Sequence, residues 1–337
     1  MGAGTQVVVL NWNGRGYVGD CLRSLLDQTY ADVGVIVVDN GSTDGSVDFI
    51  RAEFPELPLV PLPENLHFAR GTNAGVEAAL RDPACRCVIT LNNDTKVDPE
   101  FVAELVRAAE PDRVAMVAAK LLFMDRPRLL NSAGLLVGRD GGTRDRGWNE
   151  PDDGKYDAAQ DVFGPSAGAA LYRREALERV GLFDGDFLAY YEDVDLAWRI
   201  RLAGWEARFA PRSVVYHKYS ASGGAHSSWR QYLFARNRTW NLIQNYPWPH
   251  AVLGPCWDSL GLAAPFLWRG RGEGAADAGP SMAVKARAQA RGRLDAWAGL
   301  RRALAKRRAR QTTRAVDAAT MGHWLRDYGV PIHDLTS

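Results

Sequence analysis

Short apolar runs without polar alternation recur along the first ninety residues, and a pattern with helical spacing follows each of the first three. The apolar runs are 6–10, 35–38, 59–60 and 87–91, and the helical patterns between them are 17–26, 47–54 and 68–80. Strands of this kind are typical of a parallel sheet that is covered on both faces. The alternation therefore predicts an α/β fold with a Rossmann-like, mostly parallel sheet flanked by helices, whose nucleotide-binding half spans residues 1–95.

The pattern changes after residue 111. We expect strands at 114–122, 129–137, 169–172 and 214–217, helices at 174–180 and 229–246, and between them a helix that stops at Gly204. This acceptor half, 96–225, would complete a catalytic domain of residues 1–225. Beyond it the sequence predicts a helical extension at 226–268, a Gly-rich linker at 269–280 and a basic helical tail at 281–337.

Carboxylates follow two of the expected parallel strands. Asp39 comes directly after one apolar run, and Asp94 comes after another, with Asn92 and Asn93 before it. Ligands of open α/β sheets bind at the carboxyl ends of the strands, so both carboxylates lie where a ligand is met. A divalent cation on a diphosphate takes oxygen ligands, which aspartate supplies. An incidental surface turn at Asp94 and an Asx-turn at Asp39 remain the alternatives.

A second acidic cluster, Glu192-Asp193-Val194-Asp195, lies in the first turn of the helix that stops at Gly204. The helix macrodipole favours negative charge there and is expected to keep Asp193 ionised, as a general base requires. Helix capping explains the same acids, but the preceding Tyr190-Tyr191 pair suits packing against a sugar ring. His217 ends another apolar run. Imidazole is a common metal ligand, although a single histidine at a strand end is often structural.

Charge sets the tail apart from the rest of the chain. Eleven of the 41 Lys and Arg residues, but one of the 40 Asp and Glu residues, lie between Lys285 and Arg314, so the remainder carries a net charge of −9. With Leu294, Trp297, Leu300 and Leu304 near helical spacing, this basic helix suits peripheral contact with an anionic membrane. A solvated helix packed on the catalytic domain is the alternative, and sparse aromatic interleaving disfavours nucleic-acid binding.

Several classes are disfavoured by what the sequence lacks. No G-x-G-x-x-G follows the first strand and no P-loop motif occurs, which argues against a nicotinamide cofactor and a P-loop NTPase. The four cysteines form no C-x-x-C pair, which suits a reducing compartment. Neither a signal peptide nor an uninterrupted membrane span is evident, so we expect a cytoplasmic protein, peripheral at the inner face of the membrane.

Six motifs, in order along residues 5–245, resemble the family 2 inverting glycosyltransferases with the GT-A fold, particularly the bacterial rhamnosyltransferase-like members. The matching stretches are 7–14, 37–45, 65–75, 91–94, 181–184 and 191–199. Six motifs in the family's order are far more specific than any one of them. The resemblance therefore implies the GT-A fold and glycosyl transfer.

The resemblance also implies a role for each matching residue. Asp193 would be the base that deprotonates the acceptor hydroxyl, and Asp94 with His217 would hold Mg²⁺ or Mn²⁺ on the donor diphosphate. The nucleotide would be enclosed by Leu10, Asn11, Asp39, Arg70, Asn73, Asn92 and Asn93, with Asp39 on the pyrimidine base. The acceptor side would include Trp148, Gly168, Tyr191 and Glu192. Asn92 stands at the first acidic position of the family's D-x-D motif, so we expect weaker metal binding without donor.

The implied reaction moves a hexose, with L-rhamnose the first choice, from a dTDP- or UDP-sugar to a hydroxyl of a glycan, a lipid-linked acceptor or a small molecule. Such a reaction would serve bacterial cell-surface polysaccharide or glycoconjugate biosynthesis. A homodimer is left open.

Three alternatives are weighed against this function. A processive polysaccharide synthase should show a Q-x-x-R-W motif and transmembrane helices, and a sugar-1-phosphate nucleotidyltransferase should have a Gly-rich loop after the first strand; neither pattern is present. A non-catalytic protein that binds sugar nucleotides or glycans with the same fold is disfavoured by the retention of Asp94, Asp193 and His217.

Overall fold

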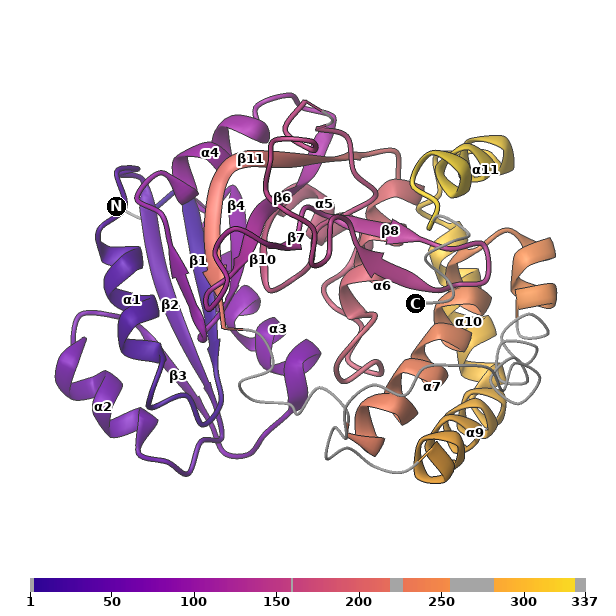
Figure 1. Cartoon of the computed structure of the whole chain (residues 1–337), viewed down its shortest axis with the longest axis horizontal. Coiled ribbons are helices and arrows are strands. Elements are labelled where there is room, and N and C mark those ends of the chain that lie inside the picture. Colours follow the sequence, from indigo (N-terminus) through magenta and orange to yellow (C-terminus); the bar gives the residue numbers. More distant parts are fainter. Residues whose placement is uncertain (1–2, 159, 219–226, 255–281, 331–337) are drawn as a thin grey trace. The chain divides into compact units, whose positions relative to one another are not determined.

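A computed structural model of the chain, shown in Figure 1, describes residues 3–158, 160–218, 227–254 and 282–330. The chain divides into two compact units. Unit 1 comprises Met1–Leu136 and Arg144–Ser222, and unit 2 comprises Val137–Thr143 and Gly223–Ser337. The linker expected at 269–280 and the apolar stretch 255–268 lie outside the described residues.

The centre of unit 1 is a nine-stranded sheet with the order β3-β2-β1-β4-β10-β6-β11-β5, in which β7 pairs with β6. Its strands are β1 (Thr5–Asn11), β2 (Val33–Asn40), β3 (Leu59–Leu62), β4 (Cys87–Asn92), β5 (Thr95–Val97), β6 (Val114–Phe123), β7 (Leu130–Ser132), β10 (Ala169–Arg173) and β11 (Glu206–His217). β1 is parallel to β2 and β4, and β6 is parallel to β11. β10 runs antiparallel to β4 on one side and to β6 on the other. The carboxyl ends of β1, β2, β4, β6 and β11 therefore lie at one edge of the sheet.

Helices cover both faces of this sheet (Figure 1). They are α1 (Val18–Leu26), α2 (Ser46–Glu53), α3 (His67–Leu80), α4 (Phe101–Ala108), α5 (Arg174–Val180) and α6 (Glu192–Leu202). The apolar side chains of the strands are buried with those of α1 and α4 in a continuous core that includes Val7, Val37, Ile89, Leu22 and Phe101. The unalternated strands are therefore buried on both faces, as the sequence pattern predicted.

Gly75 lets α3 approach the sheet closely. A Cβ atom at Gly75 would overlap Val8 and would lie 2.7 Å from Cγ2 of Val38. We expect Gly75→Ala to lower the free energy of unfolding by about 1–3 kcal/mol, because overpacking a buried contact strains its neighbours. Urea denaturation followed by circular dichroism measures this loss. The matched control is Gly322→Ala in α11 (Ala318–Asp327), where nothing lies within 4 Å and the better helix propensity of alanine should stabilise. Equal loss in both variants would contradict the packing argument.

Two strand expectations differ from the structure. The strand expected at 129–137 is wrong, because Gly134 has a φ of +103° and divides it into β7 and β8 (Leu135–Val137). β7 pairs with β6, whereas β8 pairs with β9 (Thr143–Asp145). The strand expected at 214–217 is longer and begins at Glu206. Its register on β6 shifts between Ala210 and Val214, around a proline that cannot donate to the ladder.

Unit 2 contains α7 (Ser228–Asn245), α9 (Met282–Ala298), α10 (Leu300–Gln311) and α11. The side chain of Ser227 caps α7 by accepting a hydrogen bond from the backbone N–H of Arg230 at 3.2 Å. The tail expected to be helical contains α9, α10 and α11, and Gly299 separates α9 from α10. None of the helices in the described ranges is both long and apolar enough to cross a membrane.

Candidate active site

Asp94 and His217 meet where β4 passes into β5. Only Asn93 and Asp94 separate these strands, and β5 pairs antiparallel with the end of β11, which places His217 opposite Thr95. As a result, Nε2 of His217 lies 3.3 Å from Oδ1 of Asp94. The backbone N–H of Lys218 donates to the carbonyl of Asp94 at 2.9 Å. Two predicted residues 123 positions apart in sequence are therefore neighbours at the edge where the parallel strands have their carboxyl ends.

Asn131 in β7 orients the imidazole of His217. Oδ1 of Asn131 lies 2.8 Å from Nδ1 of His217, and with that nitrogen donating, the lone pair of Nε2 points to the side of Asp94. An oxygen partner on one imidazole nitrogen is the usual arrangement when the other nitrogen binds a metal. The carboxylate and the imidazole are both buried. A cation between them would accept an electron pair from each.

This donor pair fits a divalent cation of the kind the sequence implied. No group of three His, Cys, Asp or Glu side chains suited to a metal occurs in the part of the chain that the structure describes. The protein would therefore supply two ligands, and the remaining positions would be left for donor oxygens and water, as is usual for Mg²⁺ on phosphates. Asn92, at the first position of the D-x-D-like stretch, has Nδ2 3.4 Å from Nε2 of His217 and supplies no carboxylate.

A buried chain of side chains joins the ends of three neighbouring strands. Nδ2 of Asn93 donates to Oδ1 of Asn11 at 2.7 Å, and Nδ2 of Asn11 donates to Oδ1 of Asp39 at 2.8 Å. Oδ2 of Asp39 accepts from the backbone N–H of Ser42 at 2.9 Å, so the Asx-type turn is also formed. The sequence had placed all three in the nucleotide site, and the structure brings them together.

Asp193 reaches the same edge through the loop 166–168. Its Oδ2 accepts from the backbone N–H of Ala167 at 3.3 Å. The next residue, Gly168, accepts from the backbone N–H of Asn92 at 3.0 Å, and the carbonyl of Ala167 accepts from Oγ1 of Thr90 at 2.7 Å. The loop is thus bonded to β4 and to Asp193 at once. It places Asp193, Gly168 and the Asn92-to-Asp94 stretch in one site.

The helix that carries Asp193 begins in a strained segment. Leu188, Tyr190 and Tyr191 all have φ between +65° and +73°, a conformation that costs a non-glycine residue of order 1–2 kcal/mol. Tyr191, the N-cap residue of α6, makes no side-chain cap. Tyr191 and Glu192 are buried, whereas Tyr190 is partly exposed. Of the tyrosine pair, Tyr190 therefore has the ring surface that a sugar would contact.

Glu192 and Asp193 are adjacent carboxyl groups with different surroundings. Burial raises the pKa of Glu192 well above its usual range, and the charge of Asp193 raises it further. Oε2 of Glu192 has no hydrogen-bond partner within the described ranges. Burial also raises the pKa of Asp193, but the N–H groups of Val194 and Ala167 oppose that rise. Two like charges so close favour one proton on the pair, and the larger rise at Glu192 means that this residue keeps the proton in preference to Asp193.

Asn73, a predicted donor-side residue on α3, is bonded to the segment before Asp193. Nδ2 of Asn73 donates to the carbonyl of Phe183 at 2.8 Å, and Oδ1 of Asn73 accepts from the N–H of the same residue at 3.1 Å. The N–H of Ala69 donates to the carbonyl of Leu188 at 2.9 Å. The Arg70 side chain lies beside Gly185, and Leu10 lies beside Gly71. Asn73 therefore holds this segment in place.

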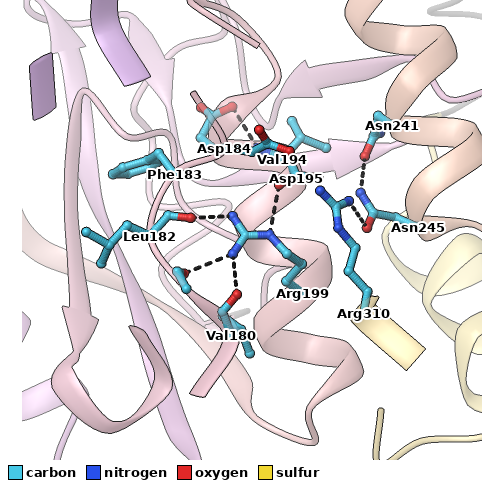
Figure 2. Close-up of polar contacts among 12 residues, drawn as sticks. Val180, Leu182, Phe183, Asp184, Val194, Asp195, Arg199, Asn241, Asn245 and Arg310 are labelled. Atoms are coloured by element: carbon cyan, nitrogen blue, oxygen red, sulfur yellow. Dashed lines mark hydrogen bonds and ion pairs between the residues drawn. The ribbon is translucent and has the colours of Figure 1, made fainter. Parts of the chain in front are cut away.

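Arg199 is a residue to which the sequence assigned no role. Figure 2 shows its guanidinium between α6 and the end of α5. Nε donates to Oδ2 of Asp195 at 2.8 Å, and the terminal nitrogens donate to the carbonyls of Val180, Gly181 and Leu182 at 2.7–2.9 Å. Arg199 thereby fixes α6, which carries Asp193.

Trp148 lies near the histidine. Its ring packs edge-on against Phe123 with centroids 5.0 Å apart, and Phe123 is opposite His217 in the sheet. The indole is 39% exposed, so the ring offers a face to a ligand.

Residues 6–181 match the family model of glycosyl transferase family 2. Because this match covers more than half of the chain, the protein belongs to that family and is a glycosyltransferase.

Curated relatives include the N-acetylglucosaminyl-diphospho-decaprenol L-rhamnosyltransferase of Mycobacterium tuberculosis, 27% identical over 241 residues, which are 65% of this chain and 77% of the relative. The O-antigen biosynthesis protein RfbC of Myxococcus xanthus is 28% identical over 215 residues, 60% of this chain and 16% of RfbC. Among solved structures, S. aureus TarS 1-349 matches with a TM-score of 0.54 at 13% identity, and the match covers 97% of this chain and 92% of the TarS chain. GalNAc-T7 with UDP, GalNAc and Mn²⁺ has a TM-score of 0.57 at 14% identity, over 72% of this chain and 48% of its own. The fold is the predicted GT-A fold.

Proposed function

We propose that this protein transfers L-rhamnose from a dTDP- or UDP-linked donor to a hydroxyl of a lipid-linked acceptor, with inversion at the anomeric carbon. The observation that carries the proposal is the loop 166–168, which joins Asp193 to the strand end beside the Asp94–His217 pair. The sugar and the lipid link are supported by the similarity to the mycobacterial rhamnosyltransferase, whose name specifies a diphospho-decaprenol acceptor.

Asp94 and His217 would hold Mg²⁺ or Mn²⁺. When bound, the cation would act as a Lewis acid that neutralises charge on the departing nucleoside diphosphate. GalNAc-T7, which shares the fold, was crystallised with Mn²⁺. Asn131 contributes by holding the imidazole of His217 with Nε2 toward Asp94.

The residues of the chain perform the remaining steps. Asp39 and Asn11 would bind the pyrimidine base, and their mutual hydrogen bond at 2.8 Å orients both for it. Asp193 would take the proton of the acceptor hydroxyl as that oxygen attacks the anomeric carbon. The bond to the diphosphate breaks on the opposite face of the sugar, so a single displacement inverts the configuration. Glu192, whose pKa burial raises well above its usual range, would hold the proton in preference and leave the negative charge on Asp193.

A screen of donors by thermal shift tests the proposal. A ligand that binds only the native state at 100 times its Kd stabilises that state by about 2.7 kcal/mol, so the correct donor with Mn²⁺ should raise the Tm by several degrees. Asp94→Asn should remove the part of the rise that depends on Mn²⁺, whereas Asp98→Asn, outside the site, should not. Transfer to a lipid-linked acceptor is then followed by NMR of the anomeric proton. No rise in Tm with any dTDP- or UDP-sugar, or retention of configuration, would refute the proposal.

Activity should depend on pH through Asp193. The base must be ionised, and burial raises the pKa of Asp193 above its usual value. As pH falls through that raised pKa the ionised fraction decreases, so kcat should fall with acid at a higher pH than an ordinary aspartate would dictate. A pH profile of kcat at saturating donor and acceptor measures the acid limb. A flat kcat down to the usual aspartate range near pH 4 would show that Asp193 is not the base.

A further inference from the structure

One side of α9 is used to pack on α7. Nε2 of Gln289 donates to Oε1 of Gln231 at 2.8 Å, and the hydroxyl of Tyr232 donates to Oδ2 of Asp295 at 2.8 Å. Nε1 of Trp240 donates to the carbonyl of Ala296 at 3.1 Å. These contacts advance together along both helices, so α9 follows α7 in the same direction. Asp295, the one acid in the sequence of α9 and α10, faces a partner within this bundle.

The inward arginines of α10 complete the same packing. Arg307 donates to the carbonyls of Ile243 and Tyr246 at 2.8 Å each. Arg310 donates to Oδ1 of Asn245 at 2.6 Å, as Figure 2 shows. Cations at the negative carboxyl end of a helix stabilise it. Part of the basic charge therefore has a structural role at the end of α7.

A row of exposed residues lies on the side of α9 and α10 that faces away from this packing. Positions 287, 294, 301 and 308 recur at intervals of seven, and all are exposed. The exposed fraction is 69% for Leu294 and 49% for Trp297, which lies beside this row. Arg291 does not belong to the row, because its Nε lies 3.9 Å from Oδ2 of Asp295. We define the basic face as Arg287, Leu294, Trp297, Arg301 and Arg308, which combines three arginines with two exposed apolar side chains and includes no acid.

We propose that the basic face docks the protein on a bilayer that contains anionic phospholipids. Arginines attract the negatively charged headgroups, and Leu and Trp side chains between them partition into the interface. A nucleic acid would use the arginines but would leave Leu294 exposed, so the bilayer matches more of this surface. The inference concerns unit 2 alone. It rests on the proposed function in one respect, because a lipid-linked acceptor would be reached from such a bilayer.

Co-sedimentation of the full chain with vesicles tests the inference. At low salt the protein should bind vesicles of equal parts phosphatidylglycerol and phosphatidylcholine, and should bind pure phosphatidylcholine far more weakly. The variant R287E/R301E/R308E should lower the partition coefficient by about 100-fold or more, because each basic residue at an anionic surface is worth roughly fivefold. The variant L294A/W297A should lower it by about tenfold. The control R51E/R81E carries two charge reversals on exposed arginines of unit 1 and should bind like the wild type.

Three results would overturn the inference: equal binding to both kinds of vesicle, wild-type binding by R287E/R301E/R308E, or release from anionic vesicles by stoichiometric duplex DNA. The melting temperature of each variant confirms that it is folded. Transfer to a short-chain, water-soluble acceptor is measured in parallel and should be unchanged in R287E/R301E/R308E. Vesicle binding without any transfer activity in the wild type would refute the proposed function and support the docking surface.

Discussion

Asp193→Asn is expected to lower kcat by about 10²–10⁴-fold, the usual contribution of a general base, and to leave donor binding unchanged. Asparagine keeps the shape of the side chain and one acceptor oxygen, so it retains one of the two bonds that Oδ2 and Oδ1 of Asp193 accept from the N–H groups of Ala167 and Val194. It has no basic oxygen for the acceptor proton. Single-turnover transfer and a thermal-shift titration with donor separate the two effects.

Glu192→Gln is the matched control, since both substitutions replace a carboxyl of the adjacent pair with an amide. Glu192 is the member that holds the proton, so a neutral amide reproduces its charge, and this variant should keep most of its activity. The outcome that contradicts the assignment is a near-wild-type rate in Asp193→Asn, or loss of activity in Glu192→Gln alone.

Arg199→Leu is expected to lower the free energy of unfolding by about 3–5 kcal/mol. The substitution leaves the carboxylate of Asp195, which is fully buried, without its cation, and it removes the donors to three backbone carbonyls. Arg199→Lys should recover little, because an ammonium group cannot span these partners in the way a planar guanidinium does. Urea denaturation followed by tryptophan fluorescence gives the loss.

Two controls distinguish loss of the buried network from loss of any ion pair: a variant that breaks an exposed pair, and a double variant that also removes the charge of Asp195. Arg23→Leu breaks an exposed pair with Asp20 and should cost less than about 1 kcal/mol. Arg199→Leu combined with Asp195→Asn should be more stable than Arg199→Leu alone, because the unpaired buried charge is gone. A loss for Arg199→Leu as small as that for Arg23→Leu would show that the network does not hold α6.

The nucleotide-binding half could be predicted because its signals are local. Each strand and helix within residues 5–92 has its own apolar pattern, and Asp39 and Asp94 mark strand ends that the fold places at one edge. The same pattern failed at Gly134, where a single left-handed residue divides the expected strand.

The supporting residues of the site could not be predicted, because their contacts depend on tertiary structure. Asn131 is 86 positions from His217 and lies in a strand of three residues that has no periodicity of its own. For Arg199 one feature could have indicated a structural role. Almost every residue of α6 is buried, and an arginine in such a helix requires a partner. The left-handed segment before Asp193 contains no glycine at the strained positions, so nothing in its composition indicates the turn.

That left-handed segment constrains how the enzyme can diverge. The conformation of Leu188, Tyr190 and Tyr191 is intrinsically unfavourable, so the position of the base depends on the bonds that Ala69 and Asn73 make to the same segment. A substitution on α3 chosen to suit a new nucleotide would therefore also displace Asp193, the proposed base. We therefore expect donor and acceptor preferences to change together during evolution.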